Sequence, residues 1–415
     1  MKQQAKKVLK QQVEEEEVLC CCEYVNRHGE RSHVAACCCD CEDLDDACDR
    51  FLKREPQKAE SLSQITAVVS DRIRVPWLWG GAQKLDLSII PPLILLPALL
   101  HLAAFHFLLG VAVLTALPGL VLWYYYFTHR KKGRTLFFLS LALFSLGYMY
   151  YLFVSEVLPR GDVGRAEVAA VSVGVVLTLM ALLHTKRDPG VVRPVHSTVT
   201  YHSPLPDRDS SLSGGRRDVS TTATNRAGSP EMNESSQRNW CSACGVVRPP
   251  RAGHCRICGV CVQRLDHHCV WINSCVGQAN HRSFLLTLAF FLTTSLYGVS
   301  LVLRSVCPQQ NRLTALLYCP GVYDQYSTAL CFTCAWYSSI VTGGLLHLLL
   351  VQLVNISYNV TEREARAALR EKTARKACWG LVVDTGVHSR GLRGNWSEFM
   401  TMGDQLKSSS PADLV

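Results

Sequence analysis

Hydrophobic residues gather in long uninterrupted runs, and charged segments separate these runs. The longest run, residues 87–127, contains no Asp, Glu, Lys or Arg over 41 positions. A helix needs about 20 apolar residues to cross a hydrocarbon core of about 30 Å. This run therefore predicts two membrane-spanning helices, which we divide near Leu109-Gly110.

Four further apolar runs are each long enough for one span. They cover residues 135–155, 168–184, 284–303 and about 330–354. The pattern thus predicts an all-α polytopic membrane protein with six transmembrane helices, four within residues 87–184 and two within 284–354. The predicted spans lack Asp, Glu, Lys and Arg. This argues against a transporter, whose spans carry ionisable residues.

The polar segments set the predicted orientation. They are an N-terminal region (1–84), a Ser/Thr-rich linker that reads as disordered (185–239), a Cys-rich stretch (240–283) and a tail (355–415). Lys and Arg are abundant after the second predicted span, in the segment 186–282 and in the tail, whereas the 304–329 loop has only Arg304 and Arg312. The positive-inside rule then places both termini and the Cys-rich stretch in the cytosol. Cys307 and Cys319 would face the lumen and can form a disulfide.

Composition narrows the protein class further. The chain has 415 residues, of which 48% are hydrophobic, and a net charge of +9. We do not interpret this charge as a nucleic-acid signal, because the basic residues flank apolar runs. The polar first 80 or so residues do not resemble a signal peptide. They hold clustered cysteines that we interpret either as acyl acceptors or as a Cys-rich surface or further metal site: Cys20, Cys21, Cys22, Cys37, Cys38, Cys39, Cys41 and Cys48.

The stretch from Cys241 to Cys275 contains seven Cys and three His. Thiolates and imidazoles with CxxC spacing are typical of tetrahedral zinc sites. Two zincs take eight ligands, which leaves two of the ten candidates over. Asp266, His267 and Cys269 together supply a carboxylate, a base and a thiol, the parts of a nucleophilic site. The alternative is that all ten residues are structural, as in a RING-like zinc scaffold anchored to the membrane.

This stretch resembles the DHHC family of protein S-acyltransferases (palmitoyltransferases). Asp188-Pro189-Gly190 also matches a short family motif that follows the span before the zinc domain. The matching residues of the Cys-rich stretch are Cys241, Cys244, His254, Cys255, Cys258, Cys261, Asp266, His267, His268, Cys269, Cys275, Asn280 and Phe284.

The resemblance implies two structural Zn²⁺ ions with interleaved ligands. Cys241, Cys244, His254 and Cys261 would hold the first, and Cys255, Cys258, His268 and Cys275 the second. Cys269 would carry the acyl group as a thioester, His267 would act as base and Asp266 would orient it. The acyl donor would be palmitoyl-CoA, and the acceptors would be membrane-proximal cysteines of other proteins. We expect a multi-pass protein of the Golgi or endoplasmic reticulum; a membrane-anchored zinc scaffold without acyltransferase activity is the alternative.

The tail carries three further signals. Thr361 and Glu364 form a capping box, which predicts a helix to about Ala377. The resembled family usually shows Thr-Thr-x-Glu here, and this chain has Glu362 in place of the second Thr. Gly391, Asn395, Trp396 and Phe399 resemble the family's C-terminal motif, whose Asn packs against the membrane domain. The final Asp413-Leu414-Val415 fits recognition by a PDZ domain, in which the peptide adds as a strand.

Overall fold

The computed structural model describes residues 23–25, 31–33, 49–50, 52–53, 55–56, 73–76, 81–130, 135–193, 239–372, 375–376, 382–383 and 387–402. The N-terminal Cys clusters, most of the linker and the C-terminal tripeptide lie outside these residues. The chain divides into two compact units. One comprises Met1–Leu99 and Thr135–Ser145, and the other comprises Leu100–Arg134 and Leu146–Val415.

The first unit contains two short strand pairs and apolar helical segments. Strand β1 (Glu23–Val25) pairs with β2 (Arg31–His33), and β3 (Arg74–Val75) pairs with β4 (Gln83–Lys84), both antiparallel. Asp86 caps a short 3₁₀ helix (Leu87–Ile89) by accepting a 2.9 Å hydrogen bond from the Ser88 amide. Helix α4 (Ile90–Ala103) follows it directly, and α6 (Phe137–Leu152) also begins in this unit.

Five helical segments are long and apolar enough to cross a membrane. They are Phe107–Phe127 within α5 (Phe107–Arg130), Phe137–Arg160, which continues α6 through a π turn (Phe153–Val157) and a 3₁₀ turn (Leu158–Arg160), α7 (Arg165–Thr185), α9 (His281–Val306) and α11 (Tyr326–Ser357). The segment Leu87–Ala103 is apolar but shorter. Of the six predicted spans, five are therefore helices of membrane-spanning length.

The break inside the first apolar run differs from the prediction. The chain leaves the helix at residues 104–106, and Gly110 lies within the first turns of α5. The imidazole of His106 explains this position, because its Nδ1 accepts a 3.1 Å hydrogen bond from the Leu108 amide. A side chain that accepts from one of the first free amides starts a new helix there. The predicted division near Leu109-Gly110 was therefore wrong by several residues.

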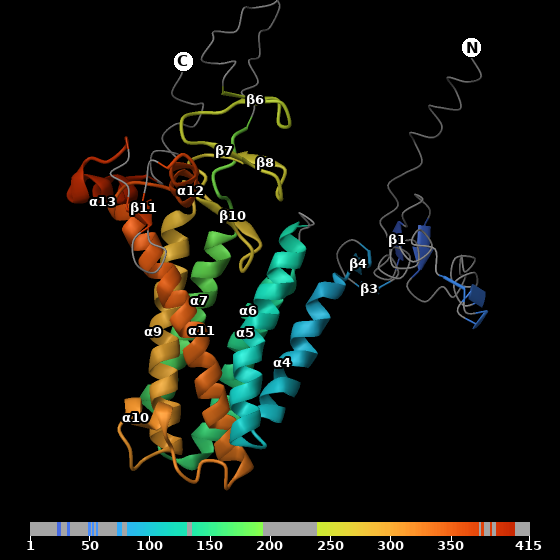
Figure 1. Ribbon diagram of the computed structural model, residues 1–415, viewed down its shortest axis with the longest axis vertical. Helices are drawn as coiled ribbons and strands as arrows, with labels where there is room; N and C mark the ends of the chain where they lie inside the picture. Colours follow the sequence, from blue (N-terminus) through green and yellow to red (C-terminus); the bar gives the residue numbers. More distant parts are fainter. Residues whose placement is uncertain are drawn as a thin grey trace, which may run out of the picture. The chain divides into compact units, whose positions relative to one another are not determined.

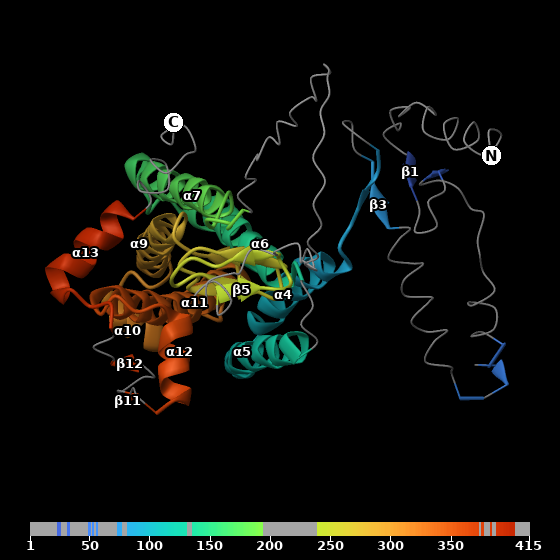
Figure 2. The ribbon, with the colours of Figure 1, turned by 90° about the horizontal axis from the view of Figure 1, so that it is seen from above.

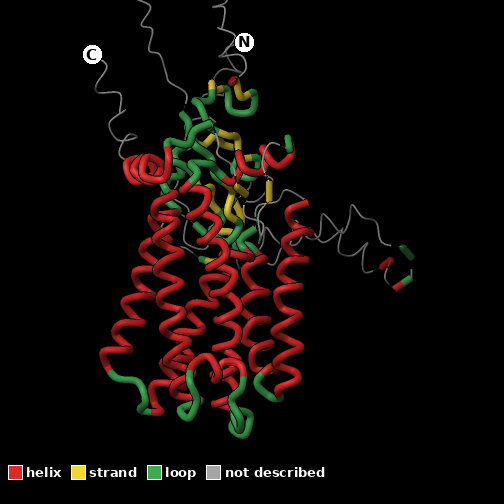
Figure 3. The backbone as a smooth tube through the Cα atoms, turned by 60° about the vertical axis from the view of Figure 1, so that its left-hand side comes forward, coloured by secondary structure: helices red, strands yellow, loops and turns green. Residues whose placement is uncertain are grey.

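In the second unit α9 runs beside α7 and α11 (Figure 1), and the view from above shows it between them (Figure 2). The α7–α9 contact is close because Gly174 has no side chain: a Cβ there would lie 2.2 Å from Thr294 Oγ1. Small residues that let two backbones approach are typical of helix packing in membranes. Figure 3 shows strands at one end of these helices and connecting loops at the other.

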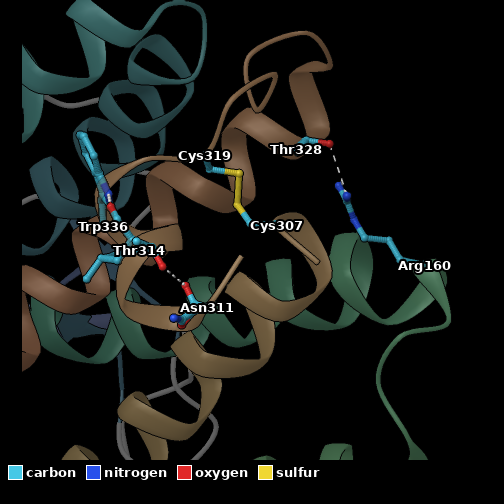
Figure 4. The surroundings of a disulfide bond; sticks show 8 residues. Arg160, Cys307, Asn311, Thr314, Cys319, Thr328 and Trp336 are labelled. Atoms are coloured by element: carbon cyan, nitrogen blue, oxygen red, sulfur yellow. Dashed lines mark hydrogen bonds between the residues drawn. A yellow bond between two sulfur atoms is a disulfide. The ribbon is translucent and has the colours of Figure 1, made fainter. Parts of the chain in front are cut away.

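The loop end is closed by a disulfide and by an ion pair. Cys307, directly after α9, is bonded to Cys319, with the two Cα atoms 6.1 Å apart (Figure 4). This confirms the disulfide that the sequence allowed. The loop between them includes the short helix α10 (Arg312–Leu317). Nearby, Arg304 Nη2 donates to Glu167 Oε2 over 2.6 Å and so ties the end of α9 to the start of α7.

At the opposite end, residues 240–283, here called the Cys-rich domain, form three antiparallel hairpins. They pair β5 (Trp240–Cys241) with β6 (Val246–Val247), β7 (Gly253–Cys255) with β8 (Val260–Val262), and β9 (His267–Cys269) with β10 (Ser274–Val276).

The tail adds α12 (Glu362–Arg370), the strand pair β11 (Arg375–Lys376) and β12 (Val382–Val383), and α13 (Gly391–Thr401). The predicted capping box is confirmed, since Thr361 Oγ1 accepts from the Glu364 amide and Glu364 Oε2 accepts from the Thr361 amide. Helix α12 ends earlier than the predicted Ala377. Its last turn is closed by Lys372, whose φ of 60° is left-handed.

The Cys-rich domain is fixed to the helices through Asn280 and the Asp188-Pro189-Gly190 turn. Asn280 accepts from the Gly277 amide over 2.9 Å and donates to the Thr185 carbonyl at the end of α7 over 2.7 Å. The Gly190 carbonyl accepts from the Gln263 amide over 2.8 Å. These bonds join the end of α7, the last hairpin and the start of α9.

We predict that Gly277→Ala destabilises this junction between the Cys-rich domain and the helices. An added Cβ would lie 2.4 Å from Val262 Cγ1 and 2.6 Å from the Pro189 carbonyl oxygen. Overpacking against backbone costs about 1–3 kcal/mol or more. We expect a lower thermal midpoint in a fixed detergent, measured by differential scanning fluorimetry. The control is Gly298→Ala, where nothing lies within 4 Å; equal midpoints for the two variants would contradict the junction.

Candidate metal centres and nucleophile

The hairpins of the Cys-rich domain repeat with a fixed period. Strands β9 and β10 begin 14 residues after β7 and β8 respectively. Each hairpin turns through a left-handed residue at the same place in the repeat, with φ of 64° at Gly245, 70° at Gly259 and 47° at Asn273. Glycine and asparagine are the residues that most readily adopt this conformation. The three hairpins are therefore three copies of one turn.

The repeat gathers the eight predicted metal ligands into two clusters. The donor atoms in each cluster lie within 4.8 Å of one another. The first cluster is Cys241, Cys244, His254 and Cys261, and the second is Cys255, Cys258, His268 and Cys275. Each contains a His and a Cys that face each other across a hairpin, His254 opposite Cys261 and His268 opposite Cys275. The second cluster is the first moved by 14 positions.

The donor geometry fits a tetrahedral ion. A zinc site with three thiolates and one imidazole has nitrogen–sulfur and sulfur–sulfur edges of about 3.5–3.8 Å. His254 Nδ1 lies 3.2, 3.7 and 3.8 Å from the three sulfurs of the first cluster. His268 Nδ1 lies 3.3, 3.7 and 3.7 Å from those of the second. Each cluster can therefore hold one metal ion with four protein ligands.

The third hairpin has the same turn without a full ligand set. Cys269 stands where Cys241 and Cys255 stand in the earlier copies, but Ile272 replaces the second cysteine of the CxxC pair. The amides of Trp271 and Ile272 still donate to the Cys269 sulfur, as the Cys258 amide does to Cys255 over 3.4 Å. Cys269 is thus a thiol in a metal-type turn that lacks its metal partners.

The alternation of strand β9 separates the two roles of its residues. Neighbouring side chains on a strand point to opposite faces. His268 faces the second metal cluster, while His267 and Cys269 share the other face and are hydrogen-bonded to each other. His267 Nδ1 donates to Asp266 Oδ2 over 2.7 Å, which leaves Nε2 for the thiol. The structure therefore brings the predicted carboxylate, imidazole and thiol together.

Asp266 is almost fully buried, and three donors satisfy its carboxylate. Besides His267, Gln352 of α11 donates to Oδ2 over 3.1 Å, and the Glu362 amide at the start of α12 donates to Oδ1 over 2.8 Å. Burial raises the pKa of Asp266, but the hydrogen bond from His267, the neighbouring imidazole charge and the Glu362 amide outweigh it and hold that pKa below its usual value. The carboxylate stays ionised.

The imidazole and the thiol are matched electrostatically. Burial lowers the pKa of His267, but the hydrogen bonds with Asp266 and Cys269 dominate and raise that pKa to about 10. Burial likewise raises the pKa of Cys269, and its hydrogen bond with His267 reverses this, so that the net shift is downward. The pair therefore favours an imidazolium beside a thiolate, the reactive form of cysteine.

Cys269 also borders the apolar helices. It is 5% exposed and packs in one cluster with Ile272, Val276, Phe284 and Leu288. Leucines of α7 and α11 border this cluster: Leu182, Leu345, Leu348 and Leu349. The nucleophilic site is therefore polar towards Asp266 and apolar towards the helices.

Two arginines tie the Cys-rich domain to the turn between α11 and α12. Arg251 donates to both carboxylate oxygens of Glu364, over 2.9 and 2.7 Å, and Arg264 donates to Asn359 Oδ1 over 2.8 Å. At the end of the tail, Asn395 Nδ2 donates to the Ser357 carbonyl over 2.8 Å, as the C-terminal motif implied. These contacts hold the first turn of α12 against Asp266.

Sequence reasoning missed Gln352 and the Glu362 amide as partners of Asp266. A signal for Gln352 was present, because an amide side chain inside a membrane span is costly unless it is hydrogen-bonded, and polar residues in spans often have a function. The Glu362 contact uses only the backbone. It therefore survives the replacement of the family's second Thr at this position.

Comparison with known proteins agrees with this geometry. The family model described as DHHC palmitoyltransferase matches residues 234–368. The chain is 64% identical over 408 residues to Palmitoyltransferase ZDHHC23-B of Danio rerio, with 95% of each chain covered. It is 51% identical over 406 residues to Palmitoyltransferase ZDHHC23 of Mus musculus (95% of each), and 51% identical over 385 residues to that of Homo sapiens (88% of this chain, 93% of the relative). With the Asp266-His267-His268-Cys269 site in place, the chain belongs to the DHHC palmitoyltransferase family.

Proposed function

We propose that this palmitoyltransferase works through a thioester on Cys269, with palmitoyl-CoA as the acyl donor. The observation that carries the proposal is the continuous hydrogen-bonded set of Asp266, His267 and Cys269. A thiol, a base and a group that orients the base are the parts of an activated nucleophile. Cys269 is also the one cysteine of the three repeated turns that stands at the first ligand position without a CxxC partner.

In the first step the Cys269 thiolate attacks the carbonyl carbon of the acyl-CoA thioester. The new carbon–sulfur bond forms as the bond to the CoA sulfur breaks. His267, held protonated by Asp266, gives its Nε2 proton to the departing CoA thiolate. The enzyme is left as the Cys269 thioester with a neutral His267.

In the second step His267 removes the proton from a cysteine of the protein substrate. That thiolate attacks the Cys269 thioester, the acyl group moves to the substrate, and the Cys269 thiolate is released beside the imidazolium. This restores the starting ion pair without a further reactant. We place the acyl chain among α7, α9 and α11, where apolar side chains border Cys269.

We assign the two clusters of four ligands to structural Zn²⁺. Zinc would supply cross-links between the hairpins, since four protein ligands leave no open position for substrate. The Cys-rich strands are only two or three residues long. Metal binding would therefore contribute much of the folding free energy of the domain.

We further propose that Leu87–Ala103 is the sixth span, short for a bilayer of about 30 Å unless its flanks contribute. The basic loops support a cytosolic position for the termini and the Cys-rich domain. The Cys307–Cys319 disulfide supports a lumenal 304–329 loop. Localisation in the Golgi or endoplasmic reticulum stays a prediction. So does a PDZ partner for Asp413-Leu414-Val415.

We expect that labelled palmitoyl-CoA forms a hydroxylamine-sensitive adduct on the purified protein, and that Cys269→Ala abolishes this adduct. The physical reason is that the substitution removes the only thiol hydrogen-bonded to His267 in the described residues. The measurement is in-gel label with and without hydroxylamine.

Zinc content is the control for this test. Cys269→Ala should keep two zincs per chain, whereas Cys258→Ser should lose zinc and the adduct together, because Cys258 is a predicted ligand. An equal adduct on wild type and Cys269→Ala would disprove the nucleophile. No adduct on either, with two zincs bound, would favour a zinc scaffold.

The ion pair predicts the pH dependence of Cys269 alkylation. Its lowered pKa means that the thiolate persists below the value of about 8.5 for a free thiol, and is lost only as pH falls through its own pKa. His267, with a pKa of about 10, stays protonated across the neutral range. Iodoacetamide labelling of Cys269, followed by mass spectrometry from pH 5 to 10, should have its midpoint below 8.5.

Asp266→Asn should move this midpoint upward, because the imidazolium loses its counter-charge. The variant is compared at equal zinc content, which shows that the domain is folded. A wild-type midpoint at or above 8.5 would contradict the ion pair.

A further inference from the structure

We propose that Gln352 and His281 are positioning residues of the acyltransferase site and act as one hydrogen-bonded relay on Asp266. Gln352 lies within α11 and is 1% exposed. Its Nε2 is 3.1 Å from Asp266 Oδ2, and its Oε1 is 2.7 Å from Nε2 of His281, the first residue of α9. The relay rests on the proposed role of Cys269.

The direction of the hydrogen bonds follows from the chemistry of the groups. An ionised carboxylate only accepts, so the amide nitrogen of Gln352 must face Asp266 and the amide oxygen must face His281. That oxygen also only accepts, so His281 donates from Nε2. Among the described residues, His281 Nδ1 is buried without a hydrogen-bond partner. His281 is therefore held as the neutral Nε2–H tautomer, and the order His281, Gln352, Asp266, His267, Cys269 is one continuous chain of bonds.

The relay acts on the atom that orients the base. Gln352 and His267 donate to the same oxygen, Asp266 Oδ2. The Glu362 amide holds the other oxygen, so Gln352 fixes the remaining rotation of the carboxylate. The direction of Oδ2 in turn sets the plane of the His267 imidazole and the aim of its Nε2 at Cys269. An amide with a purely structural role could donate to any acceptor, whereas Gln352 donates to the same carboxylate oxygen as the base His267.

His281 holds Gln352 in place from the far side. Its ring packs edge-on against Phe399 of α13, with centroids 5.2 Å apart. An unpaired amide in an apolar helix could turn to other acceptors, and the His281 bond removes that freedom. The relay therefore joins α9, α11 and the C-terminal helix to the reacting atoms without contact with substrate.

The test compares removal of the relay with its conservative replacement. Gln352→Met keeps the length of the side chain and removes both hydrogen bonds. His281→Phe keeps the ring and removes the donor, while His281→Gln keeps a donor near the Nε2 position. Thr342→Val is the matched control, because Thr342 is a buried polar residue of the same helix that bonds to Ser295 over 2.7 Å.

Each full-length protein is purified in detergent, and zinc content and thermal midpoint are measured. The rate of Cys269 adduct formation is then followed against palmitoyl-CoA concentration. Misplacement of a base by about 1 Å can cost up to about 100-fold. We expect the maximal rate of Gln352→Met and His281→Phe to fall by about tenfold or more. The half-saturating palmitoyl-CoA concentration and the two zincs should be unchanged, and His281→Gln and Thr342→Val should stay within about twofold of wild type.

The double variant Gln352→Met/His281→Phe should be no slower than Gln352→Met alone, because both substitutions break one chain of bonds. Wild-type rates in both single variants, or rates that fall only with the fraction of zinc-loaded protein, would overturn the relay. Cys269→Ala is run alongside. An adduct on that variant would overturn the proposed nucleophile, whereas its loss together with full activity in Gln352→Met would overturn the relay alone.

Discussion

The buried negative charge of Asp266 is the constraint on which the site depends. A carboxylate removed from water costs several kcal/mol unless its oxygens are paired and hydrogen-bonded. The three donors to this carboxylate are the side chains of His267 in β9 and Gln352 in α11, and the backbone amide of Glu362 in the first turn of α12. No single element can supply them. The Cys-rich domain must therefore dock on α11 and α12 before the charge is stable, and the Arg251–Glu364 contact holds that docked position.

The repeated hairpin accounts for two clusters that can hold metal ions and for the proposed nucleophile within one small domain. In each copy backbone amides donate to the first cysteine, which in the first two copies belongs to a cluster that can hold a metal ion. In the third copy Ile272 takes the place of the second cysteine, so Cys269 keeps the amide donors but lacks the second thiol of a ligand pair. His267 then supplies the positive charge that a metal would have supplied. A turn suited to a thiolate ligand becomes a turn suited to a thiolate nucleophile.

Much of this arrangement could be predicted from the sequence, because the strongest sequence signals are local. The apolar runs predicted six spans, and five of them are helices of membrane-spanning length. The spacing from Cys241 to Cys275, together with the family resemblance, predicted both clusters as the structure groups them. The 14-residue period was also visible in the sequence and would have singled out Cys269 without any family. Gln352 was not predictable in this way, since it lies 86 residues from Asp266 inside an apolar pattern. The position of the break before α5 was not predicted either. We placed it at Gly110, but the helix begins where the His106 side chain accepts from the Leu108 amide.

The position of Cys269 bears on substrate choice. Its polar side meets Asp266 through His267, and its other side meets leucines of α7 and α11. A thioester with a charged head group and a long apolar chain suits such a boundary, because the head group can stay in water while the chain lies among apolar side chains. In the proposed reaction the acceptor thiol must reach the same sulfur. A cysteine held close to the membrane satisfies this requirement, whereas one on a distant surface does not. If Cys269 is the nucleophile as proposed, its location therefore restricts which cysteines can be acylated.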